Sequence, residues 1–159
     1  MITFELTGGF FNYRVAAIVE HDGHVLVGRE EVGDFWFLPG GRCELMESSP
    51  EAVKREFQEE FGVGCNVERL VWIAENFFTL GGRTCHEIGL YFLVSLPLDS
   101  PLLDKAKRFQ FTDAAIGLEA RWFPLAEIPS INLVPAFLRT GLLDLPSTTQ
   151  HIVWDELGH

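Results

Sequence analysis

Three glutamates, Glu56, Glu59 and Glu60, stand close together in a segment with a helical pattern. At about 100° per residue of an α-helix, they fall on one face within an arc of roughly 100°. Carboxylate oxygens that converge from one rigid element are ligands that Mg²⁺ or Mn²⁺ prefers, together with water and phosphate oxygens. A solvated acidic face is the common alternative for a run of glutamates. The spacing therefore indicates either a divalent metal site or an acidic surface.

A helix over Pro50–Phe61 is predicted to position these carboxylates. Ser49 is its expected N-cap, and a proline suits the first turn because the N–H that it lacks needs no partner there. Gly62 follows the last residue, where a left-handed conformation ends a helix. An apolar stripe adjoins the acidic face and is expected to be buried: Val53, Phe57 and Phe61. The carboxylates therefore border the predicted core.

Strands are expected to outnumber helices in the rest of the chain. Apolar and β-branched runs predict them at Tyr13–Glu20, Val25–Gly28, Phe35–Leu38, Val67–Glu75, Glu87–Leu96 and Arg121–Phe123. Residues 21–24 are expected to turn the first two strands into a hairpin. A second helix is predicted over Leu133–Gly141, and a short turn over Leu125–Ile128. This pattern is typical of one α+β domain built on a mixed sheet.

The composition limits which partners to expect. The chain has 159 residues, 12 basic and 23 acidic side chains, and a net charge of −11. Such a surface disfavours large nucleic acids and anionic membranes, which attract basic proteins, and a metal would be needed to bind a phosphate. The sequence shows no signal peptide and no apolar run of membrane length. Three cysteines without CxxC spacing fit reduced thiols in the cytoplasm.

Residues 41–63 resemble the signature of the Nudix hydrolase family, which includes the MutT-like proteins. The motif positions are all present, with nothing inserted or missing: Gly41, Glu47, Arg55, Glu56, Phe57, Glu59, Glu60, Gly62 and Val63. The segment Trp36–Gly41 and the run Arg121–Phe123 are also similar to elements of that family. The resemblance implies a single Nudix domain over residues 1–159, with a mixed β-sheet packed between helices in an α/β/α sandwich.

The resemblance further implies a nucleotide pyrophosphohydrolase that uses Mg²⁺ or Mn²⁺. Such an enzyme cleaves the diphosphate linkage of a nucleoside diphosphate joined to another moiety, by attack of water on phosphorus. The metal would be held by side chains and one carbonyl at Glu56, Glu59, Glu60 and Gly40. Glu56 would be a ligand or the base. Arg55 would orient or neutralise the neighbouring carboxylates. Glu47 would pair with Arg55 or support the metal ligands from outside.

Several family features are incomplete in this chain. Members often add a carboxylate from a later loop, for which Glu119 is the first candidate and Glu87 and Asp113 are the next. Many members also carry glycine where this chain has Met46. If that position needs a positive φ, methionine would be strained there.

The substrate is less well indicated than the reaction. Phe77 and Phe78 are candidates to stack on a base, and Arg83 could contact phosphate, although a plain hairpin turn would also explain it. The proline that marks ADP-ribose-cleaving members is missing between Val63 and Pro97. Two alternatives stay open: a Nudix-fold module that senses a nucleotide without turnover, and an enzyme of the isopentenyl-diphosphate isomerase type, for which Cys43 is a poor catalytic candidate. The expected partner is a small nucleotide, and a homodimer is left open.

Overall fold

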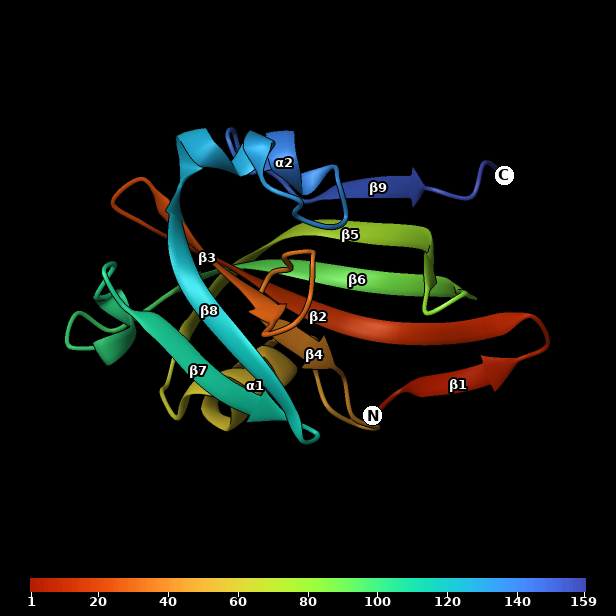
Figure 1. Ribbon diagram of the computed structural model, residues 1–159, viewed down its shortest axis with the longest axis horizontal. Coiled ribbons are helices and arrows are strands. Elements are labelled where there is room, and N and C mark those ends of the chain that lie inside the picture. Colours follow the sequence, from red (N-terminus) through yellow and green to blue (C-terminus); the bar gives the residue numbers. More distant parts are fainter.

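A computed structural model describes residues 1–159 (Figure 1). Nine strands dominate it: β1 (Thr3–Leu6), β2 (Gly9–His21), β3 (His24–Glu30), β4 (Gly40–Arg42), β5 (Asn66–Leu80), β6 (Arg83–Ser95), β7 (Arg108–Asp113), β8 (Ile116–Pro124) and β9 (Gln150–Asp155). Four helical segments connect them: α1 (Ser49–Phe61), the 3₁₀ turns η1 (Pro101–Leu103) and η2 (Leu125–Ser130), and α2 (Leu138–Gly141).

The strands form a mixed sheet in the order β7-β8-β3-β2-β6-β5-β9, and β1 and β4 also pair with β2. The pairs β2–β6 and β5–β9 are parallel, and the others are antiparallel. Only two residue pairs next to the hairpin turn join β2 to β3. The sheet therefore opens into two parts, β7-β8-β3 and β2-β6-β5-β9, beyond that turn.

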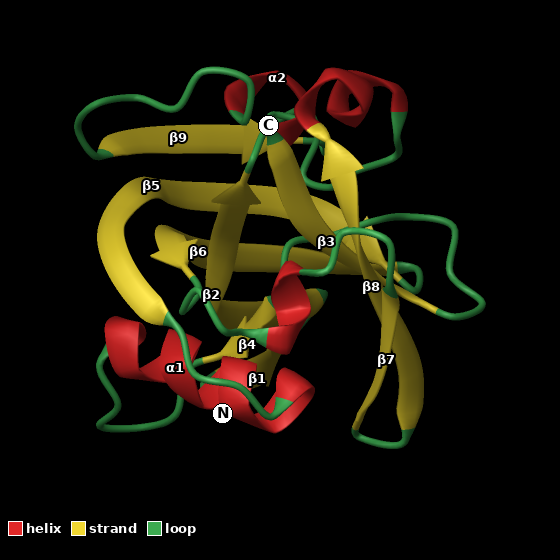
Figure 2. Ribbon diagram, turned by 90° about the vertical axis from the view of Figure 1, so that its left-hand side faces the viewer, coloured by secondary structure: helices red, strands yellow, loops and turns green.

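Two apolar cores cover the two faces of the sheet. Val15 and Ala17 of β2 face α1, where they pack in one core with Phe57. Ala16 and Ile18 point to the other face, into a core closed by η2 and α2. Figure 2 shows α1 below the strands and α2 above them. The predicted α+β sandwich with a mixed sheet between helices is confirmed.

The helix predictions were right at one place and too long at another. The first helix extends over Ser49–Phe61, with Ser48 as its N-cap in place of the predicted serine, and it ends at Gly62 with φ 67°. The predicted second helix is reduced to α2. Pro135 explains the difference, because the residue before a proline disfavours the helical conformation. The short turn at 125–128 is present as η2.

Five of the six predicted strands are present, as β2, β3, β5, β6 and β8. The strand predicted at Phe35–Leu38 was wrong, because only single bridges, Gly28 to Phe37 and Trp36 to Leu133, occur there. The predicted hairpin is present as β2–β3, and β5 and β6 are longer than predicted. The sequence did not indicate β1, β4, β7 and β9. Strand β4 has only three residues, two of them glycines, and the other three strands are largely exposed.

None of the helices has the length and apolarity that a membrane crossing requires.

Candidate functional site

The buried side of α1 fixes the direction of its acidic side chains. Ala52, Val53 and Phe57 are buried against the sheet. Glu56 lies next to this buried face, half-buried, whereas Glu59 is exposed. The helix therefore holds its carboxylates at the border between the core and solvent, as its sequence predicts.

Arg55 connects most of the acidic side chains of the signature. Its Nε and Nη2 donate to the two carboxylate oxygens of Glu47, at 2.7 and 3.0 Å. Its Nη1 donates to Glu56 Oε1 at 2.7 Å and to Glu59 Oε2 at 3.1 Å. Nη2 also donates to the carbonyl of Arg42 at 3.0 Å. The hydrogen bond from Arg55 holds the pKa of Glu47 below its ordinary value. One guanidinium thus ties the loop after β4 to the helix.

Two glutamates of α1 are destabilised as anions by burial. Burial raises the pKa of Glu56, against the opposing effect of Arg55. Burial, and then the charge of Glu56, raise the pKa of Glu60 to about 8. Glu60 Oε2 is buried without a hydrogen-bond partner. An oxygen in this position lacks the donor or cation that a buried carboxylate needs.

The two glycines of β4 allow the chain to pass close to these groups. A Cβ on Gly40 would overlap the carbonyl of Val15, and a Cβ on Gly41 would overlap the Glu56 carboxylate. Only glycine leaves room for that carboxylate at position 41. Gly40 lies one residue earlier in the same strand and pairs with Ala16 of β2.

The loop between β4 and α1 contains the departure from the family pattern. Met46 adopts φ 66°, which is the left-handed conformation in which the sequence analysis expected a methionine to be strained. Its side chain is 95% exposed, so no packing compensates the strain. Glu47 accepts a hydrogen bond from the backbone N–H of Glu44 at 2.8 Å, which closes the loop around this position.

The donor set fits a hard divalent cation in type, although its side chains do not converge. No group of three His, Cys, Asp or Glu side chains has the arrangement of a metal site. Arg55 explains this, because it draws one oxygen of Glu56 and one of Glu59 to itself. The second oxygen of each accepts no hydrogen bond, and Glu60 Oε2 is buried and unpaired. Carboxylate oxygens of this kind suit Mg²⁺ or Mn²⁺.

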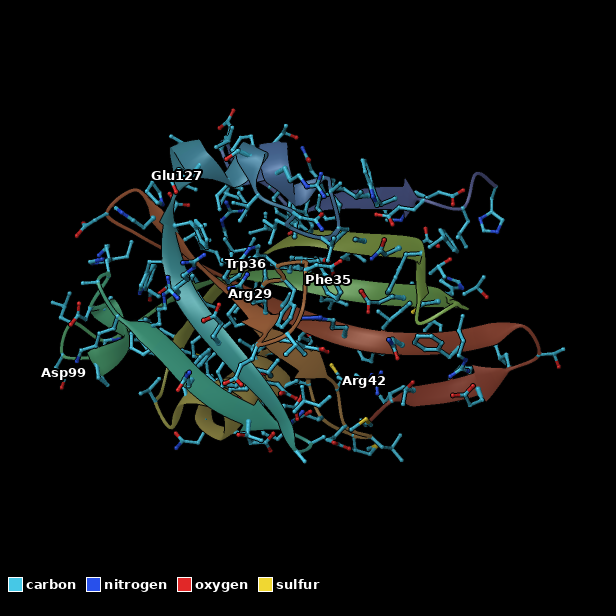
Figure 3. The ribbon with its side chains drawn as sticks, viewed as in Figure 1. Arg29, Phe35, Trp36, Arg42, Asp99 and Glu127 are labelled. Atoms are coloured by element: carbon cyan, nitrogen blue, oxygen red, sulfur yellow. The ribbon has the colours of Figure 1, made fainter.

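The later carboxylates that the sequence offered have different surroundings. Glu119 accepts a hydrogen bond from Arg29 Nε at 2.6 Å, and the Arg29 guanidinium lies 4.4 Å from the centre of the Trp36 ring. Figure 3 shows Arg29 beside Trp36. Asp113, at the end of β7, contributes to the raised pKa of Glu60, after burial and Glu56. The structure therefore brings the charge of Asp113 to the helix and engages Glu119 with an arginine.

The residues proposed to contact a base or phosphate lie at the hairpin between β5 and β6, away from α1 (Figure 1). Phe77 lines a hollow of about 370 Å³. Phe78 pairs with Cys85 and faces the other side of the sheet. Arg83 forms an ion pair with Glu5. These residues are therefore not brought together with the glutamates of α1.

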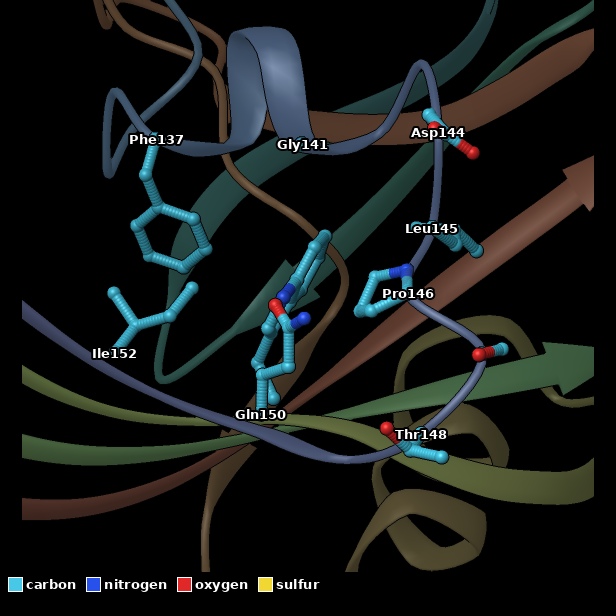
Figure 4. Close-up of a pocket in the computed structure, with 10 residues that line it drawn as sticks. Phe137, Gly141, Asp144, Leu145, Pro146, Thr148, Gln150 and Ile152 are labelled. Carbon is cyan, nitrogen blue, oxygen red and sulfur yellow. The ribbon is translucent and has the colours of Figure 1, made fainter.

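A larger hollow, of about 590 Å³, lies between α2, the following loop and strands β5 and β9 (Figure 4). Trp72, Phe137 and Gln150 line it. None of the residues predicted for the site contributes to it.

Cys43, which was considered as a catalytic residue of an isomerase, is fully buried in the core beneath α1.

The comparison with known families gives a clear result. The model of the NUDIX domain matches residues 11–141, which include most of β2, the strands β3 to β8, and α1. The chain belongs to the NUDIX family. The predicted resemblance is confirmed.

Two curated proteins illustrate the range of NUDIX relatives. A CTP pyrophosphohydrolase of Escherichia coli (strain K12) is 33% identical over 76 residues, which cover 45% of this chain and 55% of the relative. The human 8-oxo-dGDP phosphatase NUDT18 is 29% identical over 113 residues, which cover 70% of this chain and 31% of the relative. The chain thus spans about half of the first protein and about a third of the second.

Solved structures support the NUDIX fold. A NUDIX hydrolase from Nitrosomonas europaea superimposes with a TM-score of 0.61 at 18% identity, covering 91% of this chain and 79% of that one. A UDP-X diphosphatase superimposes with a TM-score of 0.60 at 23% identity, covering 89% and 66%.

The sequence reasoning missed Arg14. This residue of β2 donates from Nη2 to the carbonyl of Leu38 at 2.8 Å. Its charge opposes the burial that raises the pKa of Glu60. The sequence signal that could have indicated it is a charged side chain inside the apolar run Tyr13–Glu20. That run was interpreted only as a strand, so no chemical role was given to Arg14.

Proposed function

We propose that this chain is a divalent-metal-dependent nucleotide pyrophosphohydrolase. It would cleave the diphosphate linkage of a nucleoside diphosphate joined to another moiety, by attack of water on phosphorus. The observation that carries the proposal is the acidic site around Arg55, with one unpaired, buried oxygen on Glu60. A protein that only binds a nucleotide has no need for carboxylates that repel one another.

Water attacking a pyrophosphate meets several negative charges, so the site must neutralise oxygens and activate the nucleophile. Bound Mg²⁺ or Mn²⁺ would supply that charge and lower the pKa of water. Glu56, Glu59 and Glu60, with the Gly40 carbonyl, are the groups that would hold it. Their hard oxygen donors and the unpaired Glu60 Oε2 support this assignment.

The other residues of the site act through positioning and proton transfer. Arg55 fixes Glu56 Oε1, which leaves Oε2 to accept a proton from water. Glu47 fixes the Arg55 guanidinium with two hydrogen bonds. Glu119, held by Arg29, remains the first candidate for an additional carboxylate of the site. The printed names of the CTP and 8-oxo-dGDP relatives support a nucleotide as the substrate.

The test is a panel of nucleoside triphosphates and nucleoside diphosphates joined to sugars or phosphate, with Mg²⁺ or Mn²⁺ and identification of the products. We expect Glu59→Gln and Glu60→Gln to lower kcat/KM at least ~100-fold. Glu51→Gln is the matched control, because Glu51 lies on the same helix, exposed, and pairs only with Lys54. Turnover that survives both substitutions would exclude this mechanism, and nucleotide binding without turnover would favour the sensing module.

A further inference from the structure

A row of buried polar side chains crosses the sheet on the face opposite α1. Asn12 of β2, Glu87 of β6 and Asn76 of β5 are direct neighbours in the pairing register. Their exposed fractions are 5%, 6% and 4%. They share the face of Ala16 and Tyr91, which belong to the core under α2. We call these three residues the polar row.

The central carboxylate of the polar row has no partner in the protein. Glu87 makes no hydrogen bond and no ion pair, and its carboxylate oxygens stay in contact with solvent although the residue is only 6% exposed. Its neighbour Asn76 makes no side-chain hydrogen bond and has a fully buried Oδ1. Asn12 differs, because it accepts from Thr3 Oγ1 at 2.8 Å and donates to Cys85 Sγ at 3.7 Å. A buried amide without a partner is unfavourable, and the neighbouring Glu87 carboxylate is also unpaired, so the two side chains have the capacity to bind a polar ligand.

The surroundings of the polar row resemble a site for a flat, polar ring. A Cβ on Gly89 would lie 2.9 Å from the Tyr91 ring, so this ring lies over Gly89 and directs its hydroxyl toward Glu87. Trp154 adjoins Asn76 in the register. Phe137 packs 6.0 Å from Trp154 and 5.6 Å from Tyr91. Aromatic side chains around hydrogen-bonding groups are the usual means of binding an unpaired base.

Arg14 links the polar row to the acidic helix. It lies on the same face of β2, two residues after Asn12. Arg14 pairs with Arg42 of β4, and the adjoining Gly41 lies against the Glu56 carboxylate. At about 3.4 Å per strand residue, the polar row therefore begins ~7 Å along β2 from the strand pair that borders the catalytic glutamates, within the length of one nucleotide.

We propose that Glu87 and Asn76 bind the hydrogen-bonding edge of the substrate's base, and that this base is guanine. The two oxygens of Glu87 accept from N1–H and the 2-amino group, and Asn76 Nδ2 donates to O6. Cytosine, adenine and hypoxanthine use fewer of these groups, and uracil offers a single donor. The inference rests on the proposed function, because it names the substrate of that site.

The test compares guanosine and inosine nucleotides with the same phosphate chain, which differ only in the 2-amino group. We expect kcat/KM to favour guanosine at least 10-fold, through KM, because a site with buried acceptors discriminates against a ligand that lacks the donor. Glu87→Gln should lower this ratio below 3-fold. Glu75→Gln is the matched control, since Glu75 faces the other side of the sheet and binds His151 at 2.8 Å. An unchanged ratio in Glu87→Gln, or no preference in the wild type, would overturn the inference.

Binding of GMP and IMP, measured by calorimetry, separates this inference from the proposed function. Tighter binding of GMP that is lost in Glu87→Gln supports the base site even if no nucleotide is hydrolysed. Equal binding of both contradicts it even if hydrolysis occurs. If Glu87→Gln does not fold, Glu87→Asp keeps the charge and shortens the reach by one methylene. Its preference for GMP should fall at least 3-fold, and a full preference would again overturn the inference.

Discussion

The acidic site on α1 and the polar row on the opposite face of the sheet both hold partly buried carboxylates, but they satisfy them differently. On α1, Arg55 alone binds Glu47, Glu56 and Glu59. In the polar row, Glu87 is 6% exposed and has no hydrogen bond or ion pair with the rest of the protein. The protein therefore stabilises the first group by itself, whereas the second group depends on what it binds. Removal of a polar side chain should therefore lower the free energy of unfolding at the acidic site and raise it in the polar row.

Removing Arg55 should have the largest effect. Arg55→Ala leaves Glu47 and Glu56 without their cation, and removing one partner of these half-buried ion pairs costs roughly 1–3 kcal/mol, less than for a fully buried pair because solvent screens them in part. Urea denaturation measures this loss, and kcat/KM should fall at least ~100-fold because the carboxylates lose their positions. Lys54→Ala is the control, since Lys54 pairs with Glu51 on the exposed side of the helix. Equal stability of Arg55→Ala and the wild type would show that the guanidinium does not organise the site.

The pH dependence of stability should report the unsatisfied oxygen of Glu60. Burial, and then Glu56, raise its pKa from the ordinary 4.5 to about 8. Between these values the folded, metal-free protein holds a proton that the unfolded chain has released. The free energy of unfolding should therefore fall as pH rises from 4.5 to 8, by up to about 1.4 kcal/mol per pH unit. Urea denaturation across this range measures the slope.

Glu60→Gln provides the control for this pH dependence, because glutamine cannot lose the proton. Its stability should be flatter over the same range of pH. Added Mg²⁺ should also reduce the loss in the wild type, since a cation favours the ionised carboxylate. A wild-type curve that matches Glu60→Gln would contradict the assigned burial of this group.

A substitution in the polar row should change stability in the opposite direction. Asn76→Leu removes a buried, unpaired amide and should raise the free energy of unfolding by about 1–2 kcal/mol in the absence of nucleotide. Asn12→Leu is the matched control, because Asn12 lies in the same row with both amide groups hydrogen-bonded, and it should lower stability. Thermal denaturation of both variants compares them. A destabilised Asn76→Leu would mean that water or another group already satisfies the amide.

The same contrast explains how much the sequence could predict. The helix α1, its terminal Gly62 and the acidic face depend on residues within one short window, where spacing maps directly onto geometry. The polar row joins positions 12, 76 and 87 through a parallel pair and an antiparallel pair. No spacing along the chain encodes that register, so Glu87 entered the sequence analysis only as a spare metal ligand.

The incorrect predictions also have local causes. The aromatic run Phe35–Leu38 has the composition of a strand, but Trp36 packs between Arg29, Arg121 and Phe123 in a loop. Burial of large rings is compatible with either conformation, so composition could not distinguish them. The strand predicted over Val67–Glu75 ended too early, because β5 continues through Phe77 and Phe78 to Leu80.

The smallest expected effect concerns the loop between β4 and α1, which contains Met46 and Glu47. Met46 adopts a left-handed φ of 66°, and its exposed side chain makes no packing contacts that offset the strain. Met46→Gly should therefore raise the free energy of unfolding by about 0.5–1 kcal/mol. This value already subtracts the greater flexibility of glycine in the unfolded chain. Leu45→Gly is the control, because Leu45 is exposed without a positive φ and can only lose stability. Thermal denaturation measures both. If Met46→Gly gains stability without a change in kcat/KM, the strain is incidental; a fall in kcat/KM would mean that the stiffness of this loop helps Glu47 to hold Arg55.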